Sequence, residues 1–251
     1  MLDGEPREGA LRAEADNWLE LEKAEFISRW YETEYKDSTY SGGAGYVQAL
    51  MHRSLERGYD AQTTFNRTLE LGGNRGEHLQ FVRHSYGSYV LTDVAIRMQP
   101  PDLRNAPGRT LQLCEADAQW LPFTDGSFDR VVHACLLHHV LQPEDALREI
   151  RRVLKPGGTA DIFVSSDPGL LFRIARRLGP ARTAKGKGLG QVKRLVDARD
   201  HINHVGALRA LIRHVFRGDV VQERRYPLGL PGWNMSLWHT YRIRKALITQ
   251  S

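Results

Sequence analysis

Cysteine is scarce in this chain, which has two cysteines among its 251 residues. Both Cys114 and Cys135 lie in apolar segments that are typical of a strand or the end of a strand. Two such cysteines exclude a disulfide framework of the kind that holds small secreted domains together. We therefore expect a protein of a reducing compartment.

Long hydrophobic runs are also missing, because no stretch approaches the roughly 18 uninterrupted apolar residues of a membrane-spanning helix. The first residues, MLDGEPREGA, include acids and lack the apolar centre of a signal peptide. These absences predict a soluble, cytoplasmic protein that has no membrane among its partners.

Positive charge is unevenly distributed along the chain. The net charge is only +5, but residues 171–251 hold 17 Lys or Arg against 4 Asp or Glu, which leaves an excess of 8 acids in residues 1–170. A basic half of this kind favours a nucleic-acid surface, a membrane surface or a site for an anionic small molecule, and it is equally typical of a solvated basic face. No basic repeat interleaved with aromatics is present, so nucleic acid is not the partner that we expect.

The hydrophobic pattern divides the chain into a helical N-terminal part and an alternation of strands and helices. With 41% hydrophobic and 26% charged residues, the composition is that of a globular protein with one sizeable domain. We expect helix over most of the first 55 residues, a break at the SGGAG of residues 41–45, and a second helix at 46–57. From residue 67 onward, short apolar runs alternate with amphipathic stretches, which predicts βα units and a mainly parallel sheet.

The expected strands cover residues 67–71, 89–93, 111–115, 129–134, 160–165, 220–226 and 235–243. The expected helices cover residues 76–84, 144–154, 170–177 and 205–216, with a Gly/Lys/Arg-rich loop at 179–191. The crossover segment 95–109 contains three prolines, so we expect its helix to be short or missing.

A glycine-rich turn in LELGGNRGEHL follows the first of these strands and precedes a helix. Glycines there let the backbone pass close under a nucleotide-like cofactor, because a Cβ atom would block the approach. Glu70 ends the strand, and its carboxylate suits a cofactor end that carries an ammonium group. Asp93 ends the next strand, 23 residues further on, where it can accept hydrogen bonds from both ribose hydroxyls.

Three further motifs continue the series: CEADAQWLPFTDGSFDRVV, then LLHHV, then LREIRRVLKPGG. With them the chain resembles the class I S-adenosylmethionine-dependent methyltransferases, specifically the type-11 methyltransferase domain group, over residues 67–165. The resemblance implies an α/β, Rossmann-like fold with a seven-stranded sheet. We expect a helical N-terminal cap at residues 1–60 and a methyltransferase domain at 61–251, with a basic substrate-recognition insertion at about 166–200.

The resemblance also implies the cofactor, S-adenosylmethionine, with S-adenosylhomocysteine as product. Glu70 and the turn at residues 72–76 would hold its amino-acid end, Asp93 its ribose, Asp117 its adenine amino group and the Ala118 backbone N–H its adenine ring. The expected cofactor-binding residues are Glu70, Gly72, Gly73, Asn74, Gly76, Asp93, Val94, Asp117, Ala118 and Cys135. Asn74 stands where the family generally has glycine, but asparagine tolerates left-handed backbone better than other non-glycine residues.

Methyl transfer from a sulfonium needs no metal, and it needs a general base only when the nucleophile must lose a proton. The candidate bases are His139, in LLHHV, and His201 and His204, ahead of the last expected helix. Each of the three has a purely structural alternative in local packing or helix capping. A metal site built from His201, His204 and Asp200 has a poor ligand spacing, so we expect none.

Substrate contacts are expected from two segments. Tyr31 and Tyr35 belong to an aromatic group near the N-terminus that could close over the substrate, although helix packing explains such a group equally well. Arg199 and Asn203 lie where the family's chain returns to the mouth of the site.

The expected reaction is methylation of a small molecule. We favour O-methylation of a sugar, glycoside or other specialised metabolite of an antibiotic or polysaccharide pathway, perhaps anionic, because the C-terminal half looks similar to such enzymes and because 28 Arg against 7 Lys indicates a GC-rich genome. N- or C-methylation, RNA methylation, an NAD(P)-dependent oxidoreductase and a non-catalytic binding protein remain as alternatives. The oligomeric state stays open, with a homodimer among the options.

Overall fold

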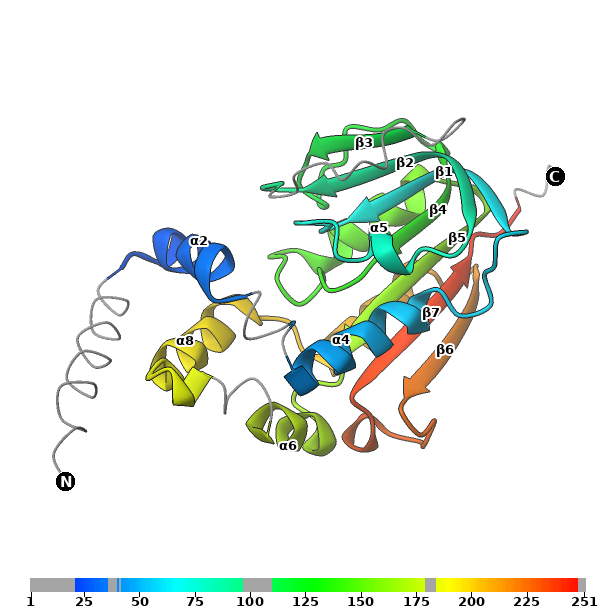
Figure 1. Cartoon of the computed structure of the whole chain (residues 1–251). Helices are drawn as coiled ribbons and strands as arrows, with labels where there is room; N and C mark the ends of the chain where they lie inside the picture. The colour runs from blue at the N-terminus through cyan, green and yellow to red at the C-terminus, as the bar shows by residue number, and fades with distance from the viewer. Residues whose placement is uncertain (1–20, 36–39, 41, 97–109, 179–183, 248–251) are drawn as a thin grey trace, which may run out of the picture.

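The computed structural model describes residues 21–35, 40, 42–96, 110–178 and 184–247. Seven strands form one sheet in the order β3-β2-β1-β4-β5-β7-β6 (Figure 1). The first five strands pair in parallel, and β7 runs antiparallel between β5 and β6. The strands are β1 (Thr64–Leu71), β2 (Ser85–Asp93), β3 (Thr110–Glu115), β4 (Phe128–His133), β5 (Leu154–Ser165), β6 (Val220–Tyr226) and β7 (Trp238–Arg244). The predicted Rossmann-like, seven-stranded fold is confirmed.

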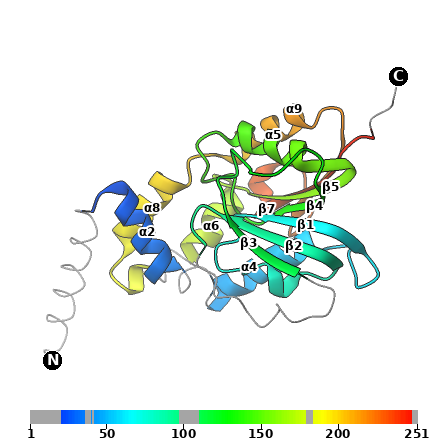
Figure 2. The same cartoon turned by 90° about the horizontal axis from the view of Figure 1, so that it is seen from above.

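Helices cover both faces of the sheet, as the view from above shows (Figure 2). On one face α5 (Pro143–Val153) packs against α9 (Val205–Val215), and on the other lies α4 (Gly42–Leu55). Helix α5 has a proline in its first turn, acids near its start and arginines in its last turn, which all favour a helix in this direction. Its buried side chains, Ala146, Leu147, Ile150 and Val153, recur at helical spacing and join the main core.

Helices α2 (Lys23–Thr33) and α8 (Gly190–Asp200) lie beside each other at one end of the molecule, and α6 (Leu170–Leu178) lies below α4 in Figure 1. Buried apolar side chains of α2, of α8 and of the residue before α8 form a separate small cluster: Phe26, Trp30, Leu189, Val192 and Val196. Segments from the two ends of the sequence therefore build this part together.

Three secondary-structure predictions need correction. The expected break at residues 41–45 is wrong, because α4 already begins at Gly42. The helix needs a glycine at position 45 because an added Cβ there would lie 2.3 Å from the carbonyl oxygen of Tyr40. The helix expected at 76–84 is reduced to a 3₁₀ turn, η1 (Leu79–Phe81). The predicted loop at 179–191 ends early, because α8 begins at Gly190 and buries Val192 and Val196. A second 3₁₀ turn, η3 (Trp233–Met235), precedes β7.

The crossover prediction for residues 95–109 falls mostly outside the described residues. Within the described ranges, no helix combines the length and the apolar character needed to cross a membrane.

Candidate functional site

The glycine-rich turn lies at the carboxyl end of β1, between β2 and β4. Gly72 and Gly76 have φ angles of +70° and +75°, and Asn74 adopts the left-handed region with φ +41°, as the sequence predicts. A Cβ atom at Gly73 would lie 2.3 Å from Cγ of the buried Leu91, so only glycine fits there. The turn therefore passes close over the sheet and leaves room above it.

A cavity of about 440 Å³ opens above this turn. Eight of the ten predicted cofactor-binding residues line it: Glu70, Gly72, Gly73, Asn74, Asp93, Val94, Asp117 and Cys135. Gly76 and Ala118 do not line it: the Gly76 N–H donates to the Gly73 carbonyl at 2.6 Å and closes the turn, and Ala118 packs into the core.

Three carboxylates in this cavity are held in place by hydrogen bonds. Asp93 accepts from the backbone N–H of Asn74 at 2.9 Å and of Ala95 at 3.1 Å, one bond to each carboxylate oxygen. Asp117 accepts from the side chain and backbone of Gln119 at 2.9 Å. A carboxylate has about four acceptor positions, so each keeps capacity for a ligand hydroxyl or amino group.

Glu70 is the buried member of the three. It accepts a hydrogen bond of 2.6 Å from the Tyr89 hydroxyl, and burial raises the pKa of its carboxyl group above the usual value. A ligand ammonium group would give this carboxylate a positively charged partner and so favour its ionised form. The acceptor groups of the cavity therefore fit the ammonium, hydroxyl and amino donors of a molecule with an amino-acid end, a ribose and an adenine.

Sequence reasoning missed a polar chain on the α4 side of the same cavity. Tyr40, His52 and His78 line the cavity, and their side chains bond in series, with 3.4 Å between Tyr40 and His52 and 3.1 Å between the two histidines. His78 continues to Glu56 at 3.0 Å, and Glu56 pairs with the fully buried Arg130 at 2.6 Å. Burial works to raise the pKa of Glu56, but Arg130 and His78 hold that pKa well below its usual range. His78 belongs to the LELGGNRGEHL motif, but the motif does not reveal its partners, which are far apart in the sequence and meet it only in the fold.

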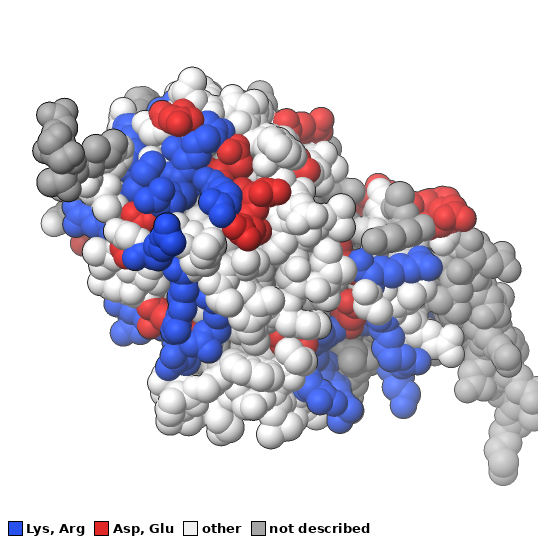
Figure 3. Space-filling view, turned by 180° about the vertical axis from the view of Figure 1, so that it is seen from behind, with Lys and Arg blue, Asp and Glu red and all other residues white. Residues whose placement is uncertain are grey.

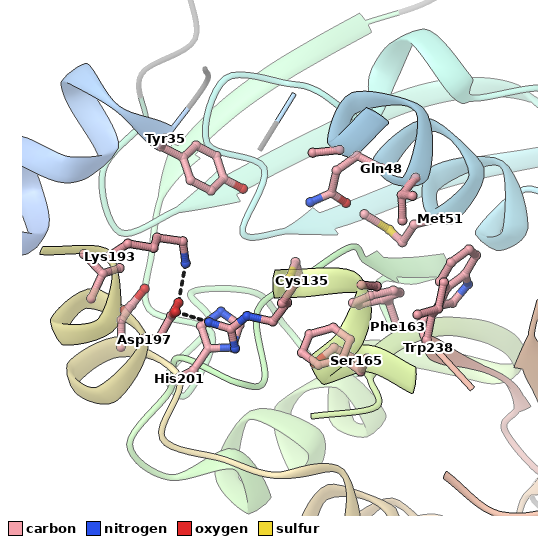
Figure 4. A pocket seen from close by; sticks show the side chains of 18 of the residues that line it. Tyr35, Gln48, Met51, Cys135, Phe163, Ser165, Lys193, Asp197, His201 and Trp238 are labelled. Atoms are coloured by element: carbon pink, nitrogen blue, oxygen red, sulfur yellow. Dashed lines mark hydrogen bonds and ion pairs between the residues drawn. The ribbon is translucent and has the colours of Figure 1, made fainter. Parts of the chain in front are cut away.

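A second cavity, of about 390 Å³, adjoins the first and is mainly apolar. Met51, Phe163 and Trp238 form one end, and Lys193, Asp197 and His201 form the other (Figure 4). The polar end is neutralised internally, since Lys193 pairs with Asp197. The apolar end offers no charged group to a ligand.

Six residues line both cavities and mark where they meet: Tyr31, Tyr35, Met51, Cys135, His139 and Asp200. The Asp200 carboxylate lies 3.0 Å from His139 Nδ1 and accepts a hydrogen bond of 2.8 Å from the Tyr31 hydroxyl. Burial works to lower the pKa of His139, but hydrogen bonds to Asp200 and Cys135 raise it to about 10. This raised pKa favours the protonated ring of His139 near neutral pH, with Asp200 beside Nδ1.

The remaining predicted site residues divide between the cavity and its surroundings. Tyr31, Tyr35 and His201 line the apolar cavity, and burial together with the neighbouring His139 keeps the pKa of His201 well below its usual value. His204 lines neither cavity: it is exposed at the start of α9.

Arg199 and Asn203, predicted to contact substrate, also line neither cavity. The guanidinium of Arg199 lies over the Phe26 ring at 5.0 Å. The side-chain amide of Asn203 donates to the carbonyls of Leu137 and Val140, at 2.9 and 2.7 Å, and so holds the loop that carries His139.

Residues 69–162 match the family described as the methyltransferase domain. The ubiquinone/menaquinone biosynthesis C-methyltransferase UbiE of Ectopseudomonas mendocina is 36% identical over 111 residues, which cover 41% of this chain and 43% of the relative. The enzyme of the same name from Pseudomonas fluorescens SBW25 is 30% identical over 61% of this chain and 62% of its own length. The chain thus spans less than half the length of the first curated relatives that it matches.

Solved structures share the fold. The CurJ carbon methyltransferase has a TM-score of 0.58 at 14% identity, covering 96% of this chain and 67% of that one. The 1,6-didemethyltoxoflavin-N1-methyltransferase of Burkholderia thailandensis, solved with S-adenosylhomocysteine, has a TM-score of 0.53 at 16% identity, covering 90% and 92%.

A parallel sheet with a glycine turn, acids at successive strand ends and a matching domain defines the Rossmann-like methyltransferase class. Residues 69–162 thus match the methyltransferase domain family, and the sheet has the fold of the class I methyltransferases, a class whose methyl donor is S-adenosylmethionine.

Proposed function

We propose that the protein methylates a lipophilic, ring-bearing small molecule at a carbon next to an ionised hydroxyl, with S-adenosylmethionine as donor. The single observation that carries this proposal is the position of the His139–Asp200 pair, which lies where the apolar cavity meets the cofactor cavity. The bound cofactor would supply an electrophilic methyl group on a sulfonium and would leave as the thioether S-adenosylhomocysteine. The ring carbon that takes the methyl group would release its proton to solvent as the ring regains its aromaticity.

The apolar cavity supports the choice of substrate class. Trp30, Phe163, Phe172 and Trp238 are among its lining residues, and aromatic side chains favour flat or apolar rings. A sugar, which the sequence favours, needs several polar partners, and the apolar end does not offer them.

The charge of His139 supports carbon over oxygen as the acceptor. Because its pKa is about 10, His139 does not serve as a base near neutral pH. It donates instead to an anionic substrate oxygen, which stabilises a phenolate or enolate. An oxygen paired in this way is a poorer nucleophile, and the negative charge is shared with the adjacent ring carbon. The names of the curated relatives, C-methyltransferases of quinone biosynthesis, point to the same type of acceptor.

The cofactor roles form part of the proposal. Glu70 would bind the ammonium group, Asp93 the two ribose hydroxyls and Asp117 the adenine amino group, and all three line the same cavity. Gly73 would keep the turn low beneath the cofactor, since its backbone lies against Leu91 with no room for a side chain between them.

The helices beyond the sheet would form the substrate enclosure. Residues from α2, α4, α6 and α8 line the apolar cavity, so we propose that the N-terminal cap of residues 1–60 and the insertion of residues 166–200 enclose the substrate jointly.

The test begins with isothermal titration of S-adenosylhomocysteine, with NAD in parallel, and continues with isotope-labelled S-adenosylmethionine and a panel of alkylated phenols, naphthols and matching sugars. We expect binding of S-adenosylhomocysteine alone and a product whose new methyl group is bonded to carbon in its NMR spectrum. Products methylated only on oxygen would overturn the role given to His139, and turnover of sugars alone would overturn the substrate class.

A further inference from the structure

Exposed apolar side chains gather along one edge of the molecule, formed by the start of α4, by α6 and by the loop between β6 and β7 (Figure 1, bottom). We call this surface the apolar edge and define it by Tyr46, Leu50, Leu170, Ile174, Leu178 and Leu228. Leu170 and Leu178 are 57% and 69% exposed, and Leu228 is 66% exposed. Contiguous exposed apolar surface on a soluble protein marks a contact with a partner or a membrane.

Helix α6 shows the pattern most clearly. Leu170, Ile174 and Leu178 recur every four residues and share one exposed face, and α6 has no buried residue. Arg173 and Arg177 lie on the same exposed side between them. A basic amphipathic helix of this composition is typical of helices that lie in the interface of a membrane.

The charge of the apolar edge has one sign. The three segments that form it, residues 42–50, 170–178 and 227–237, contain three arginines and no Asp or Glu. Figure 3 shows, at the bottom of the view from behind, an uncharged surface bordered by Lys and Arg. This surface is complementary to a layer of apolar tails with anionic headgroups.

The apolar edge also adjoins the apolar cavity. Val47 and Gln48 of α4 and Phe172 and Leu178 of α6 line that cavity, so it lies between the two helices that carry the exposed side chains. The neighbouring loop is tied to α6, because the Asn234 side chain accepts a hydrogen bond from the Leu170 backbone N–H at 3.2 Å.

We propose that the apolar edge docks on an anionic membrane surface, so that a lipophilic substrate passes from the lipid directly between α4 and α6. This inference rests on the proposed function for its substrate class, but the docking itself does not require turnover. It revises the expectation from the sequence that no membrane takes part. A second copy of the chain fits the surface less well, because a two-fold contact would bring the arginines of both copies together at a surface that carries no acid to pair with them.

The docking is tested by flotation of the full chain with vesicles of phosphatidylcholine alone or with phosphatidylglycerol added. We expect binding to the anionic vesicles only, and weakening of that binding by salt. Replacing Arg173 and Arg177 together by Ala should weaken it about 30-fold, from about 1 kcal/mol for each arginine near the surface. Replacing Ile174 and Leu228 together by Glu should weaken it at least about tenfold at any salt concentration.

Val220→Glu is the matched control, because Val220 is 61% exposed at the start of β6, outside the three segments, and its replacement should leave binding unchanged. Absence of vesicle binding, or equal binding by wild type and the Ile174→Glu, Leu228→Glu variant, would overturn the proposal. So would self-association of the chain that the same variant abolishes. Titration of S-adenosylhomocysteine on each variant separates loss of docking from failure of the cofactor site, since neither Ile174 nor Leu228 lines either cavity.

Discussion

Replacing Asp200 by Asn tests the ion pair on which the proposed chemistry depends. The Asp200 carboxylate lies 3.0 Å from Nδ1 of His139 and is close to isosteric with the amide, so the variant removes a charge and little volume. Burial remains and lowers the pKa of the imidazole, because it opposes the charged form. We therefore expect the pKa of His139 to fall from about 10 toward its ordinary value, since only Cys135 is then left to offset burial.

The size and sign of the effect follow from this shift. One pKa unit corresponds to about 1.4 kcal/mol, so the charged imidazole loses on the order of a few kcal/mol of stabilisation. Because the pKa in the folded wild type lies above that of the unfolded chain, His139 stabilises the fold fully below about pH 6.5 and loses that contribution as the pH rises through about 10. Wild-type stability should therefore decline between these two values, and this decline should be missing from the Asp200→Asn variant. Loss of one positioned donor at a developing anion also lowers kcat on the order of 100-fold.

The assay is a pH titration of the imidazole by ¹H–¹⁵N NMR, together with kcat and denaturation midpoints over the same pH range. Asp197→Asn is the control, because Asp197 lines the same cavity but pairs with Lys193, so the pKa of His139 should not move. A wild-type His139 that titrates near its ordinary pKa, or one that keeps its pKa in Asp200→Asn, would refute the reasoning.

Three further variants test the cofactor cavity and the core. Asp93→Ala should remove two ribose hydrogen bonds and so weaken the binding free energy of S-adenosylhomocysteine, measured by titration, by on the order of 1.5 to 3 kcal/mol each at most. Glu115→Ala, at the exposed end of the neighbouring strand, should keep wild-type affinity. Gly73→Ala should lower the free energy of unfolding by about 1 to 3 kcal/mol, because the added Cβ clashes with the core. Gly206→Ala is the control: this helix position has nothing within 4 Å of an added Cβ, so the substitution should raise the free energy of unfolding by up to about 1 kcal/mol. Similar values for both variants would contradict the packing argument. Arg130→Met should lower the free energy of unfolding by about 3 kcal/mol in urea denaturation, because the variant removes the buried cation that Glu56 and Asp161 share. Glu56 then keeps His78 and Asp161 keeps Arg242, and a loss under about 1 kcal/mol would contradict the role given to Arg130.

The sheet was predictable because each strand is marked by a short apolar run in the local sequence. The apolar runs of β1 and β2 end near carboxylates that line the cofactor cavity, Glu70 and Asp93, so these strand ends and cofactor residues are found together. The helix expected at residues 76–84 failed because tertiary contacts decide there: His78 is buried against Glu56, which is 22 residues away in the sequence. Local pattern cannot report a partner at that distance.

The helix α8 was missed for a related reason. Its sequence, GQVKRLVDARD, buries only Val192 and Val196, and its glycine and basic residues resemble a loop when they are read alone. The helix is completed by packing against Phe26 and Trp30 of α2, more than 150 residues earlier in the sequence. Propensity is a weak guide where the packing partner is so remote.

The substrate side of the site also depends on contacts between remote segments, and here those contacts determine the proposed chemistry. The cofactor carboxylates lie at or just after the ends of three consecutive strands, so they recur at a regular spacing in the sequence and can be recognised there. The ion pair between His139 and Asp200 joins the loop after β4 to the last residue of α8, and Tyr31 reaches it from α2. Three segments that have no common pattern must fold before this charge exists. Histidine 139 could therefore be named from the sequence as a candidate base, but its raised pKa, and with it the reason to treat it as a donor to an anionic oxygen, appears only once Asp200 is placed beside it.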